Sequence, residues 1–358
     1  MAVSFLAIKK REGFFMSESV TQKKINILSE RSKKDAKWDQ RKILNQDLEK
    51  IFSKINPVRQ NEFYEKFKNY PKRLKGCSDF LEFALRADKE TGLEVLKLSY
   101  AEFCRIRHCP ICQSRLSMKW IAKFHQIMPD LLNQYENTQF LLLTLTIKNC
   151  DVQNLRSTIQ SMNKAWDRLC KRKFFKEQIL GFIRSTEVTK NNNNEAHPHF
   201  HVLLHVKNSY FNGRNYVSQI KWISTWRSCL KVNYDPIVDI RKVRESKKRT
   251  KEENLISGAL EVVKYATKQS NIVADENWFF EFCLQVDRLR FMSTGGSLKE
   301  LIADLEKDDL IHIEEDESEK EENLSEDLGD RIVFVWDNKK HYRRDPKRDY
   351  VDDQIIKK

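Results

Sequence analysis

The stretch His197-Pro-His-Phe-His-Val-Leu-Leu-His205 decides how the centre of this chain is expected to fold. In a β-strand, alternate side chains point to the same face of the sheet. The side chains of His197, His199 and His201 are therefore expected on one face. The residues expected on the other face, toward a core, are apolar: Phe200, Val202 and Leu204.

The concentration of histidines in this stretch indicates a metal site. The whole chain has eight histidines among 358 residues, and half of them lie in these nine positions. A strand that carries several histidines by chance is the alternative, and the concentration argues against it. Because two imidazoles two residues apart on a rigid strand can bind one divalent cation, we interpret His199 and His201 as metal ligands.

A second informative segment, Ser257–Lys268, lies about sixty residues downstream. Its apolar residues recur at roughly helical spacing, which predicts a short amphipathic helix. Glu261 and Tyr265 are four residues apart and share one face of this helix, and Lys264 and Lys268 form a second such pair. A tyrosine hydroxyl, usually a poor nucleophile, can attack a metal-polarised phosphodiester. Taken alone, the segment also fits a core tyrosine beside a solvent-facing glutamate.

The two segments together resemble the HUH endonucleases, in which two histidines flank a bulky apolar residue, as in His199-Phe200-His201. Within that superfamily, the chain resembles the replication initiator (Rep) proteins of small rolling-circle plasmids. The resemblance extends from about Trp38 to Lys268. One branch of the family has a single tyrosine preceded by a glutamate four residues earlier, as here. Three motifs match in order: the strands 140–147 and 197–204, and the helix segment 261–265.

The resemblance implies a metal-dependent, site-specific endonuclease that cuts one DNA strand. His199 and His201 would bind Mn²⁺ or Mg²⁺, which withdraws charge from the scissile phosphate. Tyr265 would attack the phosphorus, form a 5′-phosphotyrosyl link and leave a 3′-OH primer. Glu261 would activate the water that ends the cycle. Lys264 and Lys268 would steady the phosphate, and two solvated helix lysines are the alternative.

The third metal ligand has two candidates. Glu187, on the strand predicted before the histidines, is the first, because its hard oxygen suits Mg²⁺ and Mn²⁺. A surface carboxylate that faces a neighbouring strand is the alternative role for Glu187. His197 is the second candidate, because it is expected on the same face as the histidine pair.

Four of the eight cysteines have the spacing of a structural zinc site. Cys109 and Cys112 form a CxxC knuckle, which allows two thiolates to bind one tetrahedral zinc ion, and Cys77 and Cys104 can complete the site. Similar initiators carry this pattern just before the first strand, so the resemblance supports the interpretation. Reduced cysteines without a metal are the alternative.

The predicted elements define an α+β fold. Their order, βαββαβ followed by one more helix, is typical of a ferredoxin-like, split βαβ antiparallel sheet, which is also the general type of the HUH core. Strands are expected at 139–147, 180–190, 198–206 and 236–243, and helices at 152–173, 216–231 and 255–269, after a long helix over 113–135.

Composition divides the chain into five expected segments. The acidic one cannot pack a core, and we expect it to be disordered. The segments are 1–75, basic and partly helical; 76–136, the cysteine-rich knuckle and long helix; 137–295, the catalytic core; 296–330, the acidic segment; and 331–358, a short strand and a basic tail.

The charge of the chain agrees with a DNA partner. The net charge is +13, and residues 300–330 alone hold 15 acidic and 2 basic residues, which leaves +26 on the remainder. Such a surplus suits release of counterions from phosphates, although it also serves solubility. The resemblance implies plasmid origin DNA, single-stranded or as a hairpin, with a host helicase and polymerase as further partners.

Other properties limit the location and the class of protein. No apolar run approaches a membrane span, and charged residues from Lys9 to Glu12 interrupt any signal peptide, so a cytoplasmic protein is expected. The alternatives are a related HUH transposase or mobilisation relaxase, a non-catalytic origin-binding protein, and a metal hydrolase with a small substrate.

Overall fold

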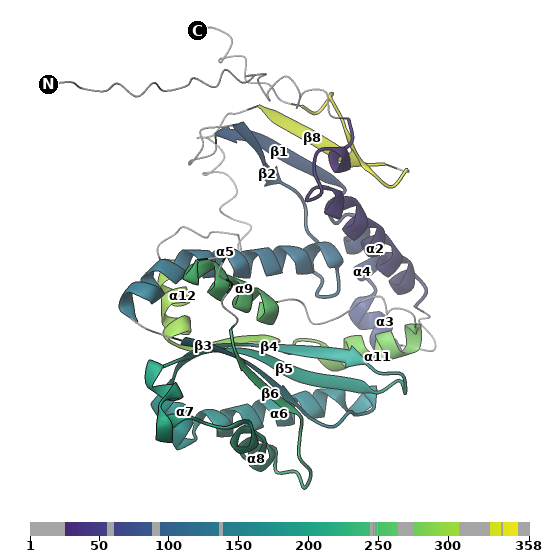
Figure 1. The fold of residues 1–358 in the computed structure, drawn as a ribbon. Coiled ribbons are helices and arrows are strands. Elements are labelled where there is room, and N and C mark those ends of the chain that lie inside the picture. Colours follow the sequence, from purple (N-terminus) through teal and green to yellow (C-terminus); the bar gives the residue numbers. More distant parts are fainter. Residues whose placement is uncertain are drawn as a thin grey trace, which may run out of the picture. The chain divides into compact units, whose positions relative to one another are not determined.

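The computed structural model describes residues 26–55, 61–87, 94–135, 139–243, 246, 248, 250–263, 275–307, 330–337 and 339–349 (Figure 1). The chain forms two compact units. The first consists of Met1–Asp47, Lys72–Cys104 and Ser318–Lys358, and the second of Leu48–Pro71 and Arg105–Glu317. Segments near the two ends of the chain therefore belong to the same unit.

The first unit contains an antiparallel sheet with the strand order β2-β1-β8-β9. The predicted strand near the C-terminus is present, and it pairs with β1, where Phe80 lies opposite Val335. Strands β1 and β2 were not predicted, because only a cysteine knuckle and a helix were expected in that region. The bounds are β1 Phe80–Ala87, β2 Glu94–Tyr100, β8 Arg331–Trp336 and β9 Tyr342–Arg344.

A buried lysine organises the centre of the first unit. Lys42 lies in helix α2 (Ala36–Ser53), and only 1% of its side chain is exposed. Its ammonium group donates to the carbonyl oxygens of Lys75 at 3.1 Å and Cys77 at 2.6 Å, and to a carboxylate oxygen of Asp79 at 2.7 Å. All three hydrogens of the ammonium therefore have acceptors, and the loop that carries Cys77 is held against the helix.

The second unit is built around a five-stranded antiparallel sheet with the order β6-β3-β5-β4-β7. Strands β3 and β4 run in the same direction and are separated by β5. The predicted α+β class with an antiparallel sheet is confirmed, and each of the four predicted core strands is present. The bounds are β3 Gln139–Thr146, β4 Ile179–Lys190, β5 Ala196–Val206, β6 Val238–Lys242 and β7 Met292–Gly296.

Helices cover both faces of this sheet (Figure 1). One face carries α6 (Leu155–Cys170), α7 (Lys173–Gln178) and α8 (Gln219–Leu230), and the other carries α5 (Pro110–Gln134), α9 (Lys251–Val263) and α12 (Ser297–Lys307). The remaining helices are α3 Asn61–Phe67, α4 Tyr70–Lys75 and α11 Glu276–Val286, with 3₁₀ turns at Leu28–Glu30, Val152–Asn154, Asn208–Phe211 and Gly213–Asn215.

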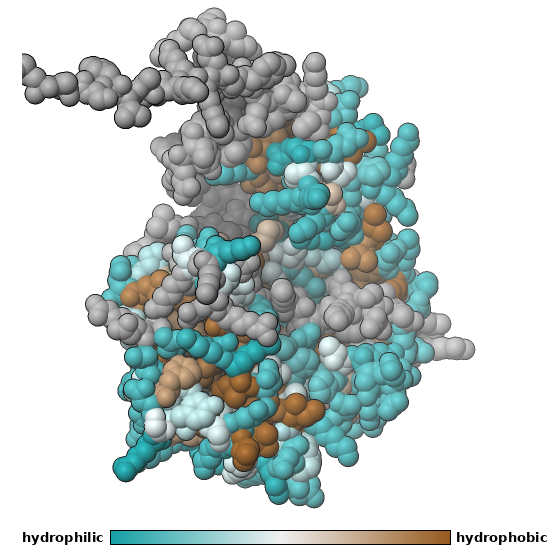
Figure 2. Space-filling model, in the orientation of Figure 1, coloured by the Kyte–Doolittle hydropathy of each residue, from teal (hydrophilic) through white to brown (hydrophobic). Residues whose placement is uncertain are grey.

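The surface in the view of Figure 2 is mostly hydrophilic where it is coloured, with separate hydrophobic patches. Within the described part of the chain, no helix combines the length and the apolar character needed to cross a membrane.

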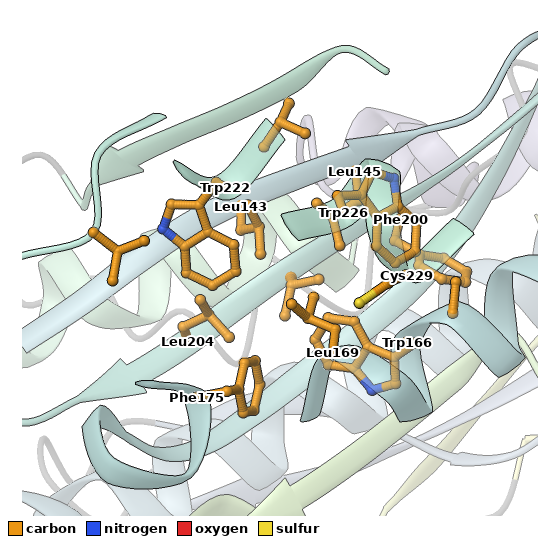
Figure 3. Packing of buried hydrophobic residues seen from close by; sticks show 14 of the residues in the cluster. Leu143, Leu145, Trp166, Leu169, Phe175, Phe200, Leu204, Trp222, Trp226 and Cys229 are labelled. Atoms are coloured by element: carbon orange, nitrogen blue, oxygen red, sulfur yellow. The ribbon is translucent and has the colours of Figure 1, made fainter. Parts of the chain in front are cut away.

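The core beneath α6 and α8 confirms the alternation predicted for the histidine strand. Phe200, Val202 and Leu204 of β5 are all fully buried there (Figure 3). Trp222 and Trp226 of α8 are also fully buried in this cluster, so they belong to the core and do not offer rings to unpaired bases. The odd-numbered residues of β5 consequently face the opposite side of the sheet.

Helix α12 corrects the boundary expected for the acidic segment. That segment was expected to be disordered from residue 296, but Ser297–Lys307 forms a helix. Its residues Leu298, Leu301 and Ile302 are buried in the core beneath α5 and α9. These three residues are spaced so that they form one apolar face of a helix. The overall acidic composition of the segment does not reveal this spacing. Residues 308–329 lie outside the described part of the chain.

The glycines before α12 mark a turn from a strand into this helix. Gly296, the last residue of β7, has a φ angle of +57°, and a Cβ atom there would lie 2.1 Å from the carbonyl oxygen of Leu180. Only glycine fits this position without strain. The two glycines at 295–296, where the composition changes, therefore mark a turn between β7 and α12, and the folded core continues beyond them.

Replacement of Leu298 by alanine is expected to lower the free energy of unfolding by about 2–5 kcal/mol, because it leaves a cavity in a core where the leucine is 0% exposed. Urea unfolding followed by circular dichroism measures this change. The control is Glu300→Ala, an exposed position on the same helix. Equal, small effects of both variants would show that α12 does not pack on the sheet.

Candidate metal centre

Two neighbouring strands bring a carboxylate next to the histidine pair. Glu187 of β4 lies directly opposite His199 of β5, and Ser185 lies opposite His201. The side chains of Glu187, His199 and His201 project from the sheet face that does not carry Phe200. One possible ligand atom from each of these three residues lies within 4.8 Å of the other two.

The contacts within this group converge on one oxygen. The Nε2 atoms of His199 and His201 lie 3.1 Å and 2.6 Å from the same carboxylate oxygen of Glu187. The side chain of His199 is 11% exposed, that of His201 is 28% exposed and that of Glu187 is 21% exposed. The group is therefore mostly shielded, with His201 the most accessible to an incoming ligand.

The outer nitrogens of both imidazoles have partners of their own. Nδ1 of His199 lies 3.2 Å from the carbonyl oxygen of His197, and Nδ1 of His201 lies 3.4 Å from the hydroxyl oxygen of Thr144. In the tautomer that donates through Nδ1, each Nε2 lone pair points toward Glu187. Histidines that bind metals are commonly oriented in this way, so the three residues fit a divalent ion. Thr144 was not recognised from the sequence, because strand pairing was needed to find it.

The charge state of Glu187 favours metal binding. Partial burial alone would raise the pKa of its carboxyl group. In the metal-free state in which both Nε2 atoms carry protons, hydrogen bonds donated by His199 and His201, together with the positive charge of the rings, outweigh burial and bring the pKa of the carboxyl group below its usual range. Glu187 is therefore an anionic oxygen ligand at neutral pH.

The structure separates the two candidates for the third ligand. His197 is outside the group of three, and its Nδ1 atom lies 2.6 Å from the side-chain oxygen of Asn149. The His197 and His199 rings are 5.1 Å apart. Burial lowers the pKa of His197, with a further contribution from His199. The geometry thus favours Glu187 as the third ligand and leaves His197 beside the site.

The fourth histidine of the stretch belongs to the core. His205 is 0% exposed, its ring stacks on Phe140 with centroids 4.8 Å apart, and its Nδ1 lies 2.8 Å from the hydroxyl oxygen of Ser297. Burial lowers its pKa to about 4, so the ring is neutral at pH 7.

Helix α9 lies against the sheet face that bears the metal group. The hydroxyl of Ser185 donates to the carbonyl oxygen of Val262, in the last turn of α9, at 2.6 Å. Glu261 is exposed, and its carboxylate pairs with the guanidinium of Arg241 on β6. Sequence reasoning missed this arginine. Glu261 is not among the three grouped ligands, and Tyr265, Lys264 and Lys268 lie outside the described residues.

The four cysteines of the predicted zinc site are divided between the two units. Cys77 and Cys104 belong to the first unit, are both buried, and are in contact: the backbone N–H of Cys104 donates to the sulfur of Cys77 at 3.5 Å. Cys109 and Cys112 belong to the second unit, where Cys109 immediately precedes α5 and Cys112 lies in its first turn. Each unit thus supplies one pair of cysteines, and four thiolates are the ligand set of tetrahedral zinc. The zinc site stays a prediction.

The fold and the first group define an α+β protein with a candidate divalent-metal site on one face of an antiparallel sheet. Comparison with known proteins places this architecture in a family. A family model described as a replication protein matches residues 95–343. The chain therefore belongs to the replication protein family.

Individual relatives agree with this assignment. The chain is 34% identical to a "Protein rep" of Streptococcus pneumoniae serotype 2, over 90% of this chain and 95% of the relative. It is 33% identical to a "Protein rep" of Lentilactobacillus hilgardii, over 87% of this chain and 96% of the relative. It is 37% identical to a "Protein rep" of Bacillus amyloliquefaciens, over 69% of this chain and 78% of the relative. No solved structure matches the chain. The predicted resemblance to Rep proteins is confirmed.

Proposed function

We propose that this protein initiates rolling-circle replication of a plasmid. In this proposal it binds the double-strand origin and nicks one strand by tyrosine transesterification. The observation that carries the proposal is the convergence of Glu187, His199 and His201 in a member of the replication protein family. The strand order, with β5 between the parallel strands β3 and β4, supports a ferredoxin-like HUH core.

The three grouped side chains would hold Mg²⁺ or Mn²⁺. When bound, such an ion supplies a positive charge that stabilises the charge developing on a scissile phosphate. Glu187 provides the hard oxygen, and the two imidazoles are oriented by Thr144 and the His197 carbonyl. The residues that orient the ligands are as much a part of the proposed site as the ligands.

Tyr265 is the proposed nucleophile. Its hydroxyl releases a proton to water as the oxygen forms a bond to phosphorus, the bond from phosphorus to the 3′ oxygen breaks, and that oxygen takes up a proton from water to become the 3′-OH primer. The position of α9 supports this role. Val262 is hydrogen-bonded to Ser185, the residue opposite His201. Tyr265 follows Val262 by three residues in the sequence.

Glu261 is proposed to end the cycle by activating a water molecule that hydrolyses a phosphotyrosyl ester. Its exposure and its position on the same helix as the nucleophile support this role. A carboxylate is a suitable general base for this step. Lys268 is proposed to steady the phosphate, and a host helicase and DNA polymerase are the proposed partners at the 3′-OH.

The proposal is tested with a library of labelled single-stranded DNA hairpins incubated with the purified protein and Mn²⁺. A covalent protein–DNA band on a denaturing gel is the expected result, and sequencing the released ends identifies the cut site. If the protein shifts DNA in a native gel but forms no covalent band with Mn²⁺ or Mg²⁺, it is a non-catalytic origin-binding protein.

The four cysteines Cys77, Cys104, Cys109 and Cys112 are proposed to form one group that binds structural zinc. The Cys109→Ser variant is expected to lose the zinc that the wild-type protein retains and to unfold at least about 5 °C lower, because bound metal stabilises the folded state. Elemental analysis and thermal unfolding measure the two effects. The control is Cys150→Ser, a half-buried cysteine outside the group. A wild-type protein purified with added zinc that retains none would contradict the assignment.

A further inference from the structure

The helical layer on the sheet face opposite the metal group carries much of the positive charge of the chain. Residues 164–178 and 207–231, which include α7, α8 and the end of α6, contain eleven lysines and arginines and two acidic residues. Their excess of nine positive charges compares with +13 for the whole protein. This part of the surface is therefore far more basic than its share of the chain predicts.

The outward face of α8 is polar and basic apart from Ile220, which is 79% exposed near the start of the helix. Its tryptophans point into the core, as Figure 3 shows, and the exposed residues repeat every three or four positions. No acidic residue occurs anywhere in 207–231. The exposed residues that form a stripe along α8 and its C-cap are Lys221, Ser224, Arg227, Ser228 and Lys231.

Neighbouring elements extend this stripe. Arg172, which lies between α6 and α7, donates to the hydroxyl oxygen of Ser228 at 2.9 Å. The ring of Phe174 in α7 packs against Trp222 with centroids 5.1 Å apart. These contacts place the basic run 171–176 beside α8. We call the exposed residues Lys171, Arg172, Lys176, Lys221 and Lys231 the α7–α8 basic surface.

The few acidic groups nearby do not neutralise this surface. Glu177 lies 3.9 Å from Lys173, and Asp235 lies 3.1 Å from Arg227, so each accounts for one cation outside the named set. Asp167, at an exposed position of α6, is the remaining carboxylate of the segments counted above. A face that serves solubility alone usually mixes both signs, because like charges repel. The excess of one sign instead favours a polyanionic partner.

The side chains of this surface indicate whether it suits single-stranded or duplex DNA. Proteins that bind single strands combine a basic groove with exposed aromatic rings on which bases stack. Here the basic residues stand on a layer of helices, and the two tryptophans of α8 are 0% exposed. The exposed rings of this segment, Phe211 and Tyr216, precede α8 and are not among the residues of the α7–α8 basic surface. Lysine, arginine and serine side chains along a helix are instead the groups that contact the backbone of a duplex.

We propose that the α7–α8 basic surface binds the phosphate backbone of duplex DNA. This inference rests on the proposed function, and it assigns the duplex to the sheet face opposite Glu187, His199 and His201. The duplex part of an origin and the strand to be cut would then contact different faces of the same sheet.

The test compares two triple variants of the full-length protein with equal changes in charge. The first is Lys171→Gln, Lys176→Gln, Lys221→Gln, within the surface. The control is Lys54→Gln, Lys68→Gln, Lys299→Gln, at exposed positions elsewhere on the second unit. Fluorescence anisotropy gives the Kd for a labelled random-sequence duplex and for one of its strands, at several NaCl concentrations and in EDTA.

The surface variant is expected to bind the duplex at least about tenfold more weakly, with a salt slope lowered by about 2–3, because each lost phosphate contact removes about 0.9 from the slope. The control should retain wild-type duplex binding. Unchanged duplex binding by the surface variant, or an equal loss in the control, would overturn the proposal. An equal loss of single-strand binding would assign the surface to single strands instead.

This assay contains no divalent metal and requires no cleavage, so its result is independent of nicking. Formation of the covalent band by the surface variant on single-stranded hairpins is measured separately and should be retained. Absence of that band in the wild-type protein would remove the proposed nickase function and leave the binding result standing.

Discussion

Replacement of Tyr265 by phenylalanine is expected to abolish the covalent protein–DNA band. Phenylalanine lacks the hydroxyl that bonds to phosphorus, whereas the ring keeps its size and apolar character. Removal of a nucleophile typically lowers the rate by at least about 10³-fold. The measurement is the initial rate of adduct formation on the hairpin substrate with Mn²⁺.

The matched control for this variant is Tyr100→Phe. Tyr100 is 46% exposed on β2, and its ring stacks on Phe80, a contact that phenylalanine keeps. Binding of uncut hairpin DNA in EDTA should be equal for both variants and the wild-type protein. If Tyr265→Phe still forms the adduct at the wild-type rate, another residue is the nucleophile and the role assigned to Tyr265 is wrong.

Loss of one metal ligand is expected to have the second large effect. In His201→Ala, one of the three converging ligand atoms is absent, and Glu187 loses its shorter contact, 2.6 Å from Nε2. Affinity for Mn²⁺ should fall at least about 100-fold, since even the loss of a residue that orients a ligand commonly costs 10–100-fold. Isothermal titration calorimetry measures the affinity, and the nicking rate should fall with it.

His197→Ala provides a stringent control, because His197 is on the same strand and the same face but contacts Asn149. This variant should keep most of the Mn²⁺ affinity. If it loses as much affinity as His201→Ala, then His197 is a ligand and the group of three is incomplete. Addition of EDTA to the wild-type protein should stop nicking, and added Mn²⁺ should restore it.

The sequence by itself determined the local features of the second unit. The alternation in the histidine strand predicts which side chains of β5 are buried, and Phe200, Val202 and Leu204 are buried as expected. The alternation follows from the period of a β-strand, which needs no information about distant residues. Helices with a continuous apolar stripe, such as α5 and α6, were predicted for the same reason.

Only the tertiary structure decided which distant segments meet. The pairing of Phe80 with Val335 and the turn at Gly296 into α12 depend on partners far along the chain. The proximity of Glu187 to the histidine pair, which favours Glu187 over His197 as the proposed third ligand, follows from register, because β4 places Glu187 opposite His199. Pairing between strands is set by the packing of whole faces, and a shift by one residue would turn every side chain of a strand to the other face. The alternation of residues within one strand predicts which face of that strand is buried. It does not predict which strands pair with it, because pairing depends on the packing of the whole sheet.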